Sequence, residues 1–310
     1  MGLKITFWLV VIPLSVAALV SDDSVDAQKT GSIPGPEEKA DVAERLPGEG
    51  HILDVVEGTR ERFDQSRSLI AGLTVNDALA RLAETFVGRP YVAMSLDGTD
   101  PEPLRLDLNR FDCMLFIEQL LALVLSESFD QFADRTRTLR YRDGDVSYCK
   151  RQHYFHDWVQ SAQRQNVLMS GIDWPGEITR SLSLNFMSMN RKLYRPLQSQ
   201  DRFDCIRKRE DGRLVVQRYV PLDAIEMMLP SVQSGDLFAI ATDVQGLDVS
   251  HTGILVREGS RVDAIHAAPG RGVMRSRSFG RYLRSIPDAI GAVIVRPVDP
   301  KNMTQEQPGI

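Results

Sequence analysis

The stretch that decides the fold is RFDCMLFIEQLLAL, which runs from Arg110 to Leu123. A polar turn leads directly into Cys113, and the residues that follow are mostly Leu, Met, Gln, Glu and Ala, without Gly or Pro. This composition predicts a buried helix. Asp112 is the expected N-cap, which places Cys113 in the first turn, where free backbone N–H groups and the helix dipole favour a thiolate. The stretch therefore predicts a nucleophilic cysteine, against the simpler alternative of a small core residue.

A β-hairpin is predicted around the loop Gly259-Ser260, between two apolar strands. A loop of two residues pairs Arg257 with Val262. Because side chains alternate along a strand, this register puts His251 and His266 on one face of the sheet. The two positions are diagonal to each other, within reach of long side chains.

These two histidines supply the groups that a nucleophilic thiol needs. A base that deprotonates a thiol usually requires a third group to orient it. We predict Cys113 as nucleophile, His251 as general base and His266 as orienting group. Gly253, opposite His266, is expected to leave space between the two imidazoles.

The order of the remaining patterns predicts the fold class. Helical spacing is followed by strands toward the C-terminus, which indicates an α+β fold with the cysteine helix packed on an antiparallel sheet that carries the histidines. The expected elements are helices at 74–86, capped by Thr74 or Asn76, and at about 279–285, with strands at 104–108, 237–241 and 291–296.

The N-terminus has the pattern of a secretory signal. An apolar run at 5–20 follows Lys4 and precedes the small-residue site Val25-Asp26-Ala27. An uncleaved anchor is the alternative. We expect an exported protein, periplasmic or secreted, with no stable membrane span after cleavage. The predicted organisation is a signal peptide at 1–27, a Gly/Pro-rich flexible linker at 28–50 and a single catalytic domain at 51–310 with a long insertion at about 130–230.

Charge and ligand spacing exclude two classes of function. A net charge of −5 argues against a general nucleic-acid binder, which needs a basic face. The locally basic stretch 202–218 also contains acidic residues and is predicted to be a solvated hairpin. His153, His156 and Asp157 lie close in sequence, but no third ligand follows at a convincing spacing, so we predict no metal site.

The chain has three cysteines, so an exported protein leaves at least one of them unpaired. Cys149 and Cys205 are candidates for a disulfide that spacing alone does not establish. The tetrapeptide Arg-Phe-Asp-Cys occurs again at 202–205, before a charged run that does not read as a buried helix. We therefore treat the repeat as coincidence and keep Cys113 as the nucleophile.

Seven blocks follow one another along the chain, at 86–91, 111–113 with Glu118, 141–144, 153–158, 235–236, 246–254 and 265–267. Together they resemble the N-acetylmuramoyl-L-alanine amidase-like family of the NlpC-type papain-like cysteine peptidases. The resemblance covers about residues 75 to 298. It implies a papain-like fold and hydrolysis of the amide between N-acetylmuramic acid and L-alanine in muropeptides, with Cys113, His251 and His266 as the triad and no cofactor.

The resemblance also implies residues that contact the muropeptide. The candidates are Tyr91 near the nucleophile, with Asp112, Glu118, Tyr154, Asp157, Trp158 and Ser250. The chain departs from the family pattern at Met114-Leu115 and at Ala268, where small or hydroxyl-bearing residues are usual. Both departures change the polarity of the expected groove.

Three alternatives remain open at this point. The same triad would also serve a γ-D-glutamyl-diaminopimelate endopeptidase, which cuts inside the stem peptide. A non-catalytic module that binds the cell wall would retain the fold. An exported structural protein would simply bury its Cys and His residues.

Overall fold

The computed structural model describes residues 43–45 and 52–299. The predicted signal peptide at 1–27 lies outside these residues, as does most of the linker predicted at 28–50. Ala43–Arg45, inside that linker, forms strand β1 and pairs antiparallel with β2 (Ile52–Val55). None of the helices within 52–299 has the length and hydrophobicity that crossing a membrane requires.

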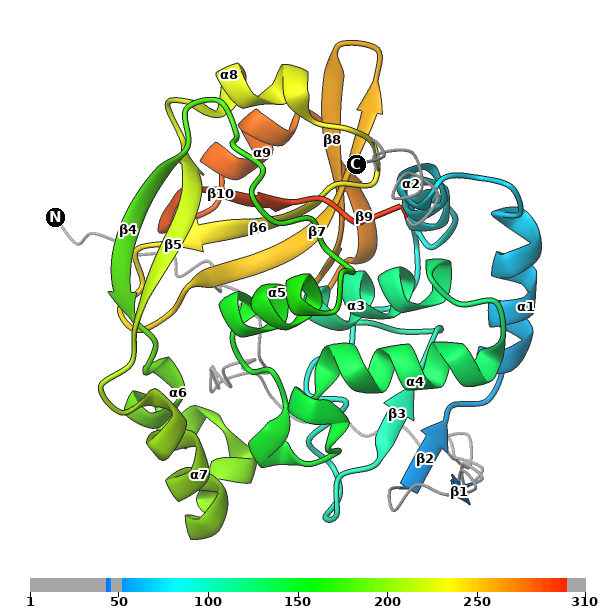
Figure 1. Ribbon diagram of the computed structural model, residues 1–310, viewed down its shortest axis with the longest axis vertical. Coiled ribbons are helices and arrows are strands. Elements are labelled where there is room, and N and C mark those ends of the chain that lie inside the picture. Colours follow the sequence, from blue (N-terminus) through cyan, green and yellow to red (C-terminus); the bar gives the residue numbers. More distant parts are fainter. Residues whose placement is uncertain (1–42, 46–51, 300–310) are drawn as a thin grey trace, which may run out of the picture.

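The protein has an α+β architecture built on a seven-stranded antiparallel sheet (Figure 1). The strand order is β4-β5-β10-β6-β7-β8-β9, and a smaller sheet joins β1, β2 and β3. The strands of the large sheet are β4 (Ile178–Ser183), β5 (Leu214–Pro221), β6 (Leu237–Thr242), β7 (Val249–Glu258), β8 (Arg261–Ala268), β9 (Gly272–Ser276) and β10 (Ala289–Val295). Strand β3 (Leu104–Leu106) lies parallel to β2.

Helices cover both faces of the large sheet. Ile254, Ile265 and Val256 pack with the core of the larger helices, whereas Leu255 and Ala264 face Phe279 and the short helices. The larger helices are α1 (Thr59–Leu69), α2 (Val75–Thr85), α3 (Cys113–Val124), α4 (Phe129–Arg140) and α5 (Phe155–Arg164). The others are α6 (Phe186–Met189), α7 (Gln200–Glu210), α8 (Ile225–Met228) and α9 (Phe279–Arg284). Short 3-10 helices occur at Arg142–Gly144, Tyr148–Lys150, Arg191–Leu193, Arg195–Gln198 and Leu229–Ser231.

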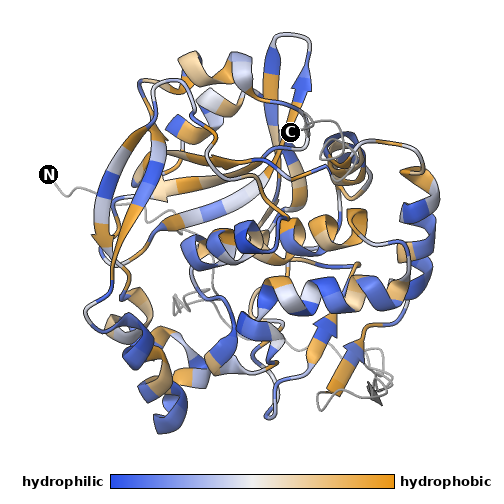
Figure 2. Ribbon diagram, in the orientation of Figure 1, coloured by the Kyte–Doolittle hydropathy of each residue, from blue (hydrophilic) through white to orange (hydrophobic). Residues whose placement is uncertain are grey.

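Helix α3 is the centre of the helical layer. Every residue except Met114 is buried, which is what a helix that is apolar all round requires. Asp112 caps it by accepting a hydrogen bond of 2.7 Å from the backbone N–H of Leu115, as predicted. In Figure 2, by contrast, α1 is mainly hydrophilic and β10 mainly hydrophobic, which fits an outer helix and a central strand.

The elements predicted from local patterns are confirmed with small shifts at their ends. Thr74 is the cap of α2, since its hydroxyl accepts from the backbone N–H of Asp77. The strands expected at 104–108, 237–241 and 291–296 are β3, β6 and β10, and the helix expected at 279–285 is α9.

The predicted hairpin register is also confirmed. Arg257 pairs with Val262 across the two-residue loop of β7 and β8. The reason given for Gly253 is wrong, however. A Cβ there would lie 2.5 Å from Cε1 of Phe238 and 2.6 Å from the carbonyl oxygen of Ile265. The glycine therefore makes room for the Phe238 ring and the neighbouring strand, and not for the imidazoles.

The hairpin predicted at 202–218 is wrong. These residues form most of α7, then a turn, then β5. Arg, Lys, Glu and Gln are good helix formers, and tertiary packing buries Ile206 and Glu210 on one side of the helix. A disulfide between Cys149 and Cys205 also ties α7 to the Tyr148–Lys150 turn, with their Cα atoms 5.8 Å apart.

Candidate active site

Cys113 opens α3 and is fixed against strand β7. It is completely buried and is the free cysteine of the three. Its carbonyl oxygen accepts a hydrogen bond of 2.8 Å from the hydroxyl of Thr252. Because Thr252 directly follows His251, this bond holds the start of the helix next to the strand that carries the first histidine.

The thiol of Cys113 is not activated in the way its position in the helix suggests. Burial raises its pKa to about 12, the Asp112 carboxylate adds to the rise, and contacts from the side chain and backbone of Thr252 oppose it. The prediction that the helix start favours a thiolate is therefore wrong for this conformation. Desolvation of a buried charge outweighs the dipole, whose effect is about 0.3–1 kcal/mol.

The two predicted histidines meet directly. Nε2 of His251 lies 2.9 Å from Nδ1 of His266, and Nε2 of His266 lies 2.9 Å from Oγ of Ser276 on β9. Nδ1 of His251 is buried and has no hydrogen-bond partner within the described part of the chain. A proton on each Nε2 satisfies both contacts, because His251 then donates to His266 and His266 donates to Ser276. This tautomer leaves the lone pair on Nδ1 of His251 free to accept a proton.

Both imidazoles are neutral at neutral pH. Burial lowers the pKa of His251 well below its ordinary value of 6.5, and the neighbouring His266 adds to the shift. Burial also lowers the pKa of His266 to about 4, with a smaller contribution from Arg271. A neutral His251 can act as a base, since its accepting nitrogen is not already protonated.

Aromatic rings surround the pair. Tyr282 of α9 stacks on His266 with ring centroids 4.7 Å apart and planes at 24°. His251 meets His266 edge to face at 4.8 Å. Burial raises the pKa of Tyr91 and of Tyr282, and the charge of a Cys113 thiolate would raise both further, which places these phenols near the thiol.

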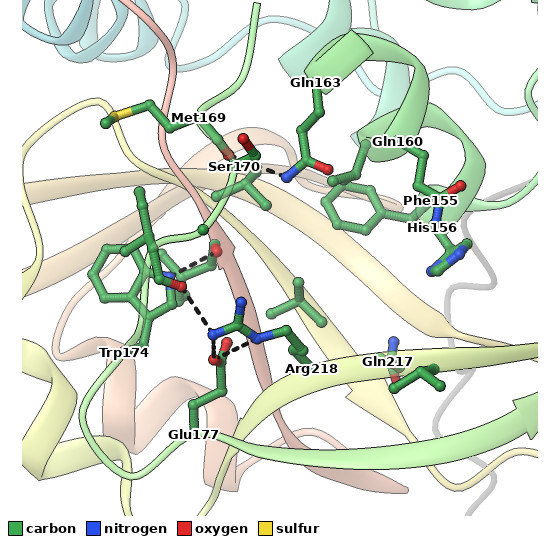
Figure 3. A pocket seen from close by; sticks show the side chains of 17 residues that line it. Phe155, His156, Gln160, Gln163, Met169, Ser170, Trp174, Glu177, Gln217 and Arg218 are labelled. Carbon is green, nitrogen blue, oxygen red and sulfur yellow. Dashed lines mark hydrogen bonds and ion pairs between the residues drawn. The ribbon is translucent and has the colours of Figure 1, made fainter.

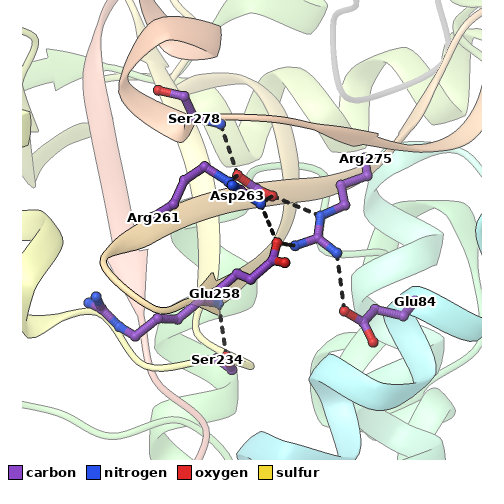
Figure 4. Close-up of polar contacts among 8 residues, drawn as sticks. Glu84, Ser234, Glu258, Arg261, Asp263, Arg275 and Ser278 are labelled. Atoms are coloured by element: carbon purple, nitrogen blue, oxygen red, sulfur yellow. Dashed lines mark hydrogen bonds and ion pairs between the residues drawn. The ribbon is translucent and has the colours of Figure 1, made fainter.

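An ion-pair network centred on the buried carboxylate of Asp263 holds the strands of the second histidine (Figure 4). Asp263 of β8 accepts from Arg261, from Arg275 of β9 and from the backbone N–H of Ser278. Arg275 also reaches Glu84 of α2 at 3.3 Å. The network fixes β8 and β9 relative to each other and to α2, and so fixes the two strands that carry His266 and Ser276.

Three predicted substrate-binding residues have protein partners around α3. Asp112 is the helix cap, and burial raises its pKa to about 6. Glu118 forms a buried ion pair of 2.7 Å with Arg140. Trp158 is 1% exposed and stacks on Phe155 within the core. Glu118 and Trp158 therefore face the protein interior and not solvent.

The other predicted binding residues come from α5, from β7 and from the segment before Cys113, and the backbone N–H of Asp157 donates to the carbonyl oxygen of Tyr154 at 3.1 Å. The hydroxyl of Tyr154 donates to Glu210 at 2.6 Å, and both are buried. Asp157 pairs with Arg209 and Arg213. Ser250 is buried beside His251, and its hydroxyl has no partner within the described residues. Tyr91 is partly exposed and lies near Cys113.

A cavity of about 270 Å³ lies between α5, β5 and β10 (Figure 3). Phe155 and His156 line it, together with Trp174 and an Arg218–Glu177 ion pair. Part of the aromatic and histidine cluster at 153–158 thus faces a cavity. His153 does not, because it is buried with Nε2 2.7 Å from the carbonyl oxygen of Tyr148. Within residues 52–299, no group of three His, Cys, Asp or Glu side chains is placed to hold a metal ion.

Sequence reasoning missed Thr252, Ser276 and Tyr282. A signal existed for Ser276, because the turn after Ala268 and the apolar residues that follow indicate a further hairpin. Strand β9 pairs Ser276 with Ala264, which puts Ser276 on the His266 face by the same alternation. No comparable local signal exists for the contact between Thr252 and Cys113.

Comparisons with known proteins show the family and the fold. The model of the family described as AmiA-like, N-acetylmuramoyl-L-alanine amidase-like, matches residues 81–291. A crystal structure of an N-acetylmuramoyl-L-alanine amidase from Bacteroides uniformis is 29% identical with a TM-score of 0.67, over 72% of this chain and 98% of that one. No match was found among curated proteins.

Two further solved structures are similar. A protein from Bacteroides fragilis, provisionally named a xylanase, is 30% identical with a TM-score of 0.62, over 69% of this chain and 98% of that one. A protein from Legionella pneumophila with the family model DUF1460 is 18% identical with a TM-score of 0.62, over 77% of this chain and 93% of that one. The Legionella likeness shows the fold alone.

Proposed function

This chain belongs to the N-acetylmuramoyl-L-alanine amidase-like family, and we propose that it is a cysteine-dependent hydrolase with a papain-like, NlpC-type fold. The proposed reaction is cleavage of the amide between N-acetylmuramic acid and L-alanine in muropeptides. The observation that carries the proposal is the contact of 2.9 Å between His251 and His266, which leaves Nδ1 of His251 buried and free to accept a proton.

The proposed reaction is acyl transfer to water. The sulfur of Cys113 attacks the lactyl carbonyl carbon while Nδ1 of His251 takes the thiol proton. His251 then returns this proton to the nitrogen of L-alanine as the C–N bond breaks and a thioester remains. A water molecule, deprotonated by His251, hydrolyses the thioester and restores the thiol. The backbone N–H of Cys113, which has no carbonyl partner within its own helix, is one candidate donor to the oxyanion.

The pKa shifts indicate at which step the thiol proton of Cys113 moves to His251. A thiol with a pKa of about 12 and an imidazole whose pKa lies well below 6.5 do not form a resting thiolate–imidazolium pair. The proton therefore moves as the sulfur attacks. His266 and Ser276 assist at that moment, because they accept and pass on the hydrogen bond from the newly charged His251.

An exported location is part of the proposal. The disulfide between Cys149 and Cys205 supports it, since disulfides persist in oxidising compartments such as the bacterial periplasm. The proposed partners are therefore peptidoglycan fragments outside the cytoplasm, as the predicted signal peptide implies.

The test is mass spectrometry of purified muropeptides incubated with the wild-type chain and with Cys113→Ala. Release of the intact stem peptide by the wild type alone supports both the bond and the nucleophile. Products cut within the stem would replace the proposed bond by the γ-D-glutamyl-diaminopimelate link. Xylan serves as a second substrate, and its hydrolysis would favour the activity named for the Bacteroides fragilis structure. Cleavage of neither, with binding retained in Cys113→Ala, would favour a wall-binding module.

A further inference from the structure

A second cavity, of about 550 Å³, lies between α5 and α7. Cys113, His251 and His266 do not line it. Its size is that of a site for a small molecule or a short chain end, since such pockets are usually about 300–1,000 Å³. The lining is unusual for a chain whose net charge is −5, because cationic side chains dominate it. They are Arg142, Lys150, Arg164, Lys208, Arg209 and Arg213.

Asp157 is the one carboxylate in the lining, so six positive charges against one negative leave a net charge of +5. Asp157 is already engaged by Arg209 and Arg213. Nζ of Lys150 lies 3.6 Å from Oδ2 of Asp143 and 3.8 Å from Oδ2 of Asp145. These two carboxylates are not part of the cavity lining, and they offset part of the charge of Lys150.

The remaining three cations have no carboxylate partner within the described chain. They are Arg142, Arg164 and Lys208, which come from three separate segments. Like charges held together without counter-charges repel one another, and a bound anion relieves this repulsion. Guanidinium groups also match the geometry of carboxylate and phosphate, because each can donate two parallel hydrogen bonds.

The walls of the cavity are held in place before any ligand binds. The disulfide between Cys149 and Cys205 joins the segment of Lys150 to the helix of Lys208 and Arg209. Arg209 also donates to the carbonyl oxygens of Cys149 and Arg151, at 3.2 and 2.8 Å. A preorganised site loses less conformational entropy when it binds.

We propose that this cavity binds a small ligand, or a chain end, that carries two or more anionic groups. Arg209 and Arg213 form the fixed inner wall, while Arg142, Arg164 and Lys208 are free to turn toward the ligand. Carboxylates and phosphates share the required chemistry. The site is separate from the proposed hydrolytic centre and does not depend on its activity.

The test is isothermal titration calorimetry of the full chain at low salt with three probes. They are a tripeptide of glutamate, the matching tripeptide of glutamine with an amidated end, and pyrophosphate. We expect the glutamate peptide or pyrophosphate to bind, the glutamine peptide not to bind, and added salt to weaken the binding. Binding of the glutamate tripeptide alone would identify a carboxylate ligand. Binding of pyrophosphate alone would identify a phosphate ligand.

Charge reversal locates the site. The double variant Arg164→Glu, Lys208→Glu changes two exposed side chains without partners and should weaken binding by at least about tenfold. The control Lys192→Glu, Arg207→Glu changes the net charge equally at exposed positions outside the lining, and should stay within about twofold. Equal weakening by both pairs, or no preference for charged over neutral probes, would overturn the proposal.

Discussion

The hydroxyl of Thr252 donates a hydrogen bond of 2.8 Å to the carbonyl oxygen of Cys113, across 139 residues of sequence. The bond is buried and links the first residue of α3 to β7. It fixes the position of the nucleophile relative to the histidine strand, so we treat Thr252 as a positioning residue.

Thr252→Val should lower both stability and turnover. The substitution keeps the shape of the side chain but removes the hydroxyl donor to a buried carbonyl oxygen, which retains its helical hydrogen bond, at a cost of about 0.5–1.5 kcal/mol. A small displacement of the thiol should lower kcat by about 10–100-fold. Thr179→Val, at an exposed position on β4, is the matched control. Unchanged kcat in a destabilised Thr252→Val chain would show that the bond is structural only.

Ser276→Ala should weaken the base without touching the thiol. His266 loses its acceptor at 2.9 Å and with it part of the preference for the required tautomer. We expect kcat to fall roughly tenfold. This is part of the rate enhancement of about 10²–10⁴-fold that general-base catalysis contributes. Ser276→Thr, which keeps the hydroxyl, should recover activity, and Ser183→Ala on exposed β4 is the control. Equal losses in the Ala and Thr variants would point to packing instead.

Alkylation of Cys113 should reveal a neutral thiol. Because its pKa is raised to about 12, the thiolate fraction should rise about tenfold per pH unit over the whole range from about pH 7 to about pH 10. The measurement is the rate of modification by iodoacetamide, followed by mass spectrometry. Glutathione is the control, and its rate should level off above a pKa of about 8.5–9. A rate for Cys113 that does not change with pH would indicate a preformed thiolate.

His266 should make the fold sensitive to mild acid. Its pKa is about 4 in the folded chain and 6.5 ordinarily, so below pH 6.5 the unfolded chain binds more protons than the folded one. The contribution of the neutral His266 to the free energy of unfolding is fully present above pH 6.5. About 3 kcal/mol of it is lost as the pH falls toward 4. Burial raises the pKa of Asp112 and Asp248 to about 6, which acts in the opposite direction.

The difference between wild type and His266→Asn separates these effects. Urea unfolding between pH 7 and pH 4 should show the wild type losing more stability than the variant, by up to about 3 kcal/mol. Parallel losses in the two chains would mean that His266 titrates normally when folded.

Glu118→Gln should affect stability and not substrate affinity. The change leaves the buried Arg140 guanidinium without its counter-charge, which costs about 3–5 kcal/mol. Thermal unfolding should therefore shift while KM stays the same. Glu127→Gln, at an exposed position just after α3, is the control. A rise in KM with little loss of stability would restore Glu118 as a residue that contacts the substrate.

The sequence by itself determined the elements that depend on near neighbours. The helix of Cys113 with its Asp112 cap follows from local composition and capping. The pairing of His251 with His266 follows from a two-residue turn and the alternation of side chains in strands. Both depend on interactions between residues less than about 20 positions apart in the sequence, and the periodic pattern of side chains predicts such interactions.

Tertiary structure decided what depends on burial and on distant partners. The thiol of Cys113 is neutral because the fold removes it from water, and no local pattern measures that depth. The contact with Thr252 and the disulfide between Cys149 and Cys205 join segments far apart in sequence. Stretch 202–218 is helix and strand because packing buries one side of α7, although its charges suggested a solvated hairpin. Charge in sequence is a local property, whereas desolvation and clustering of charge are properties of the folded chain.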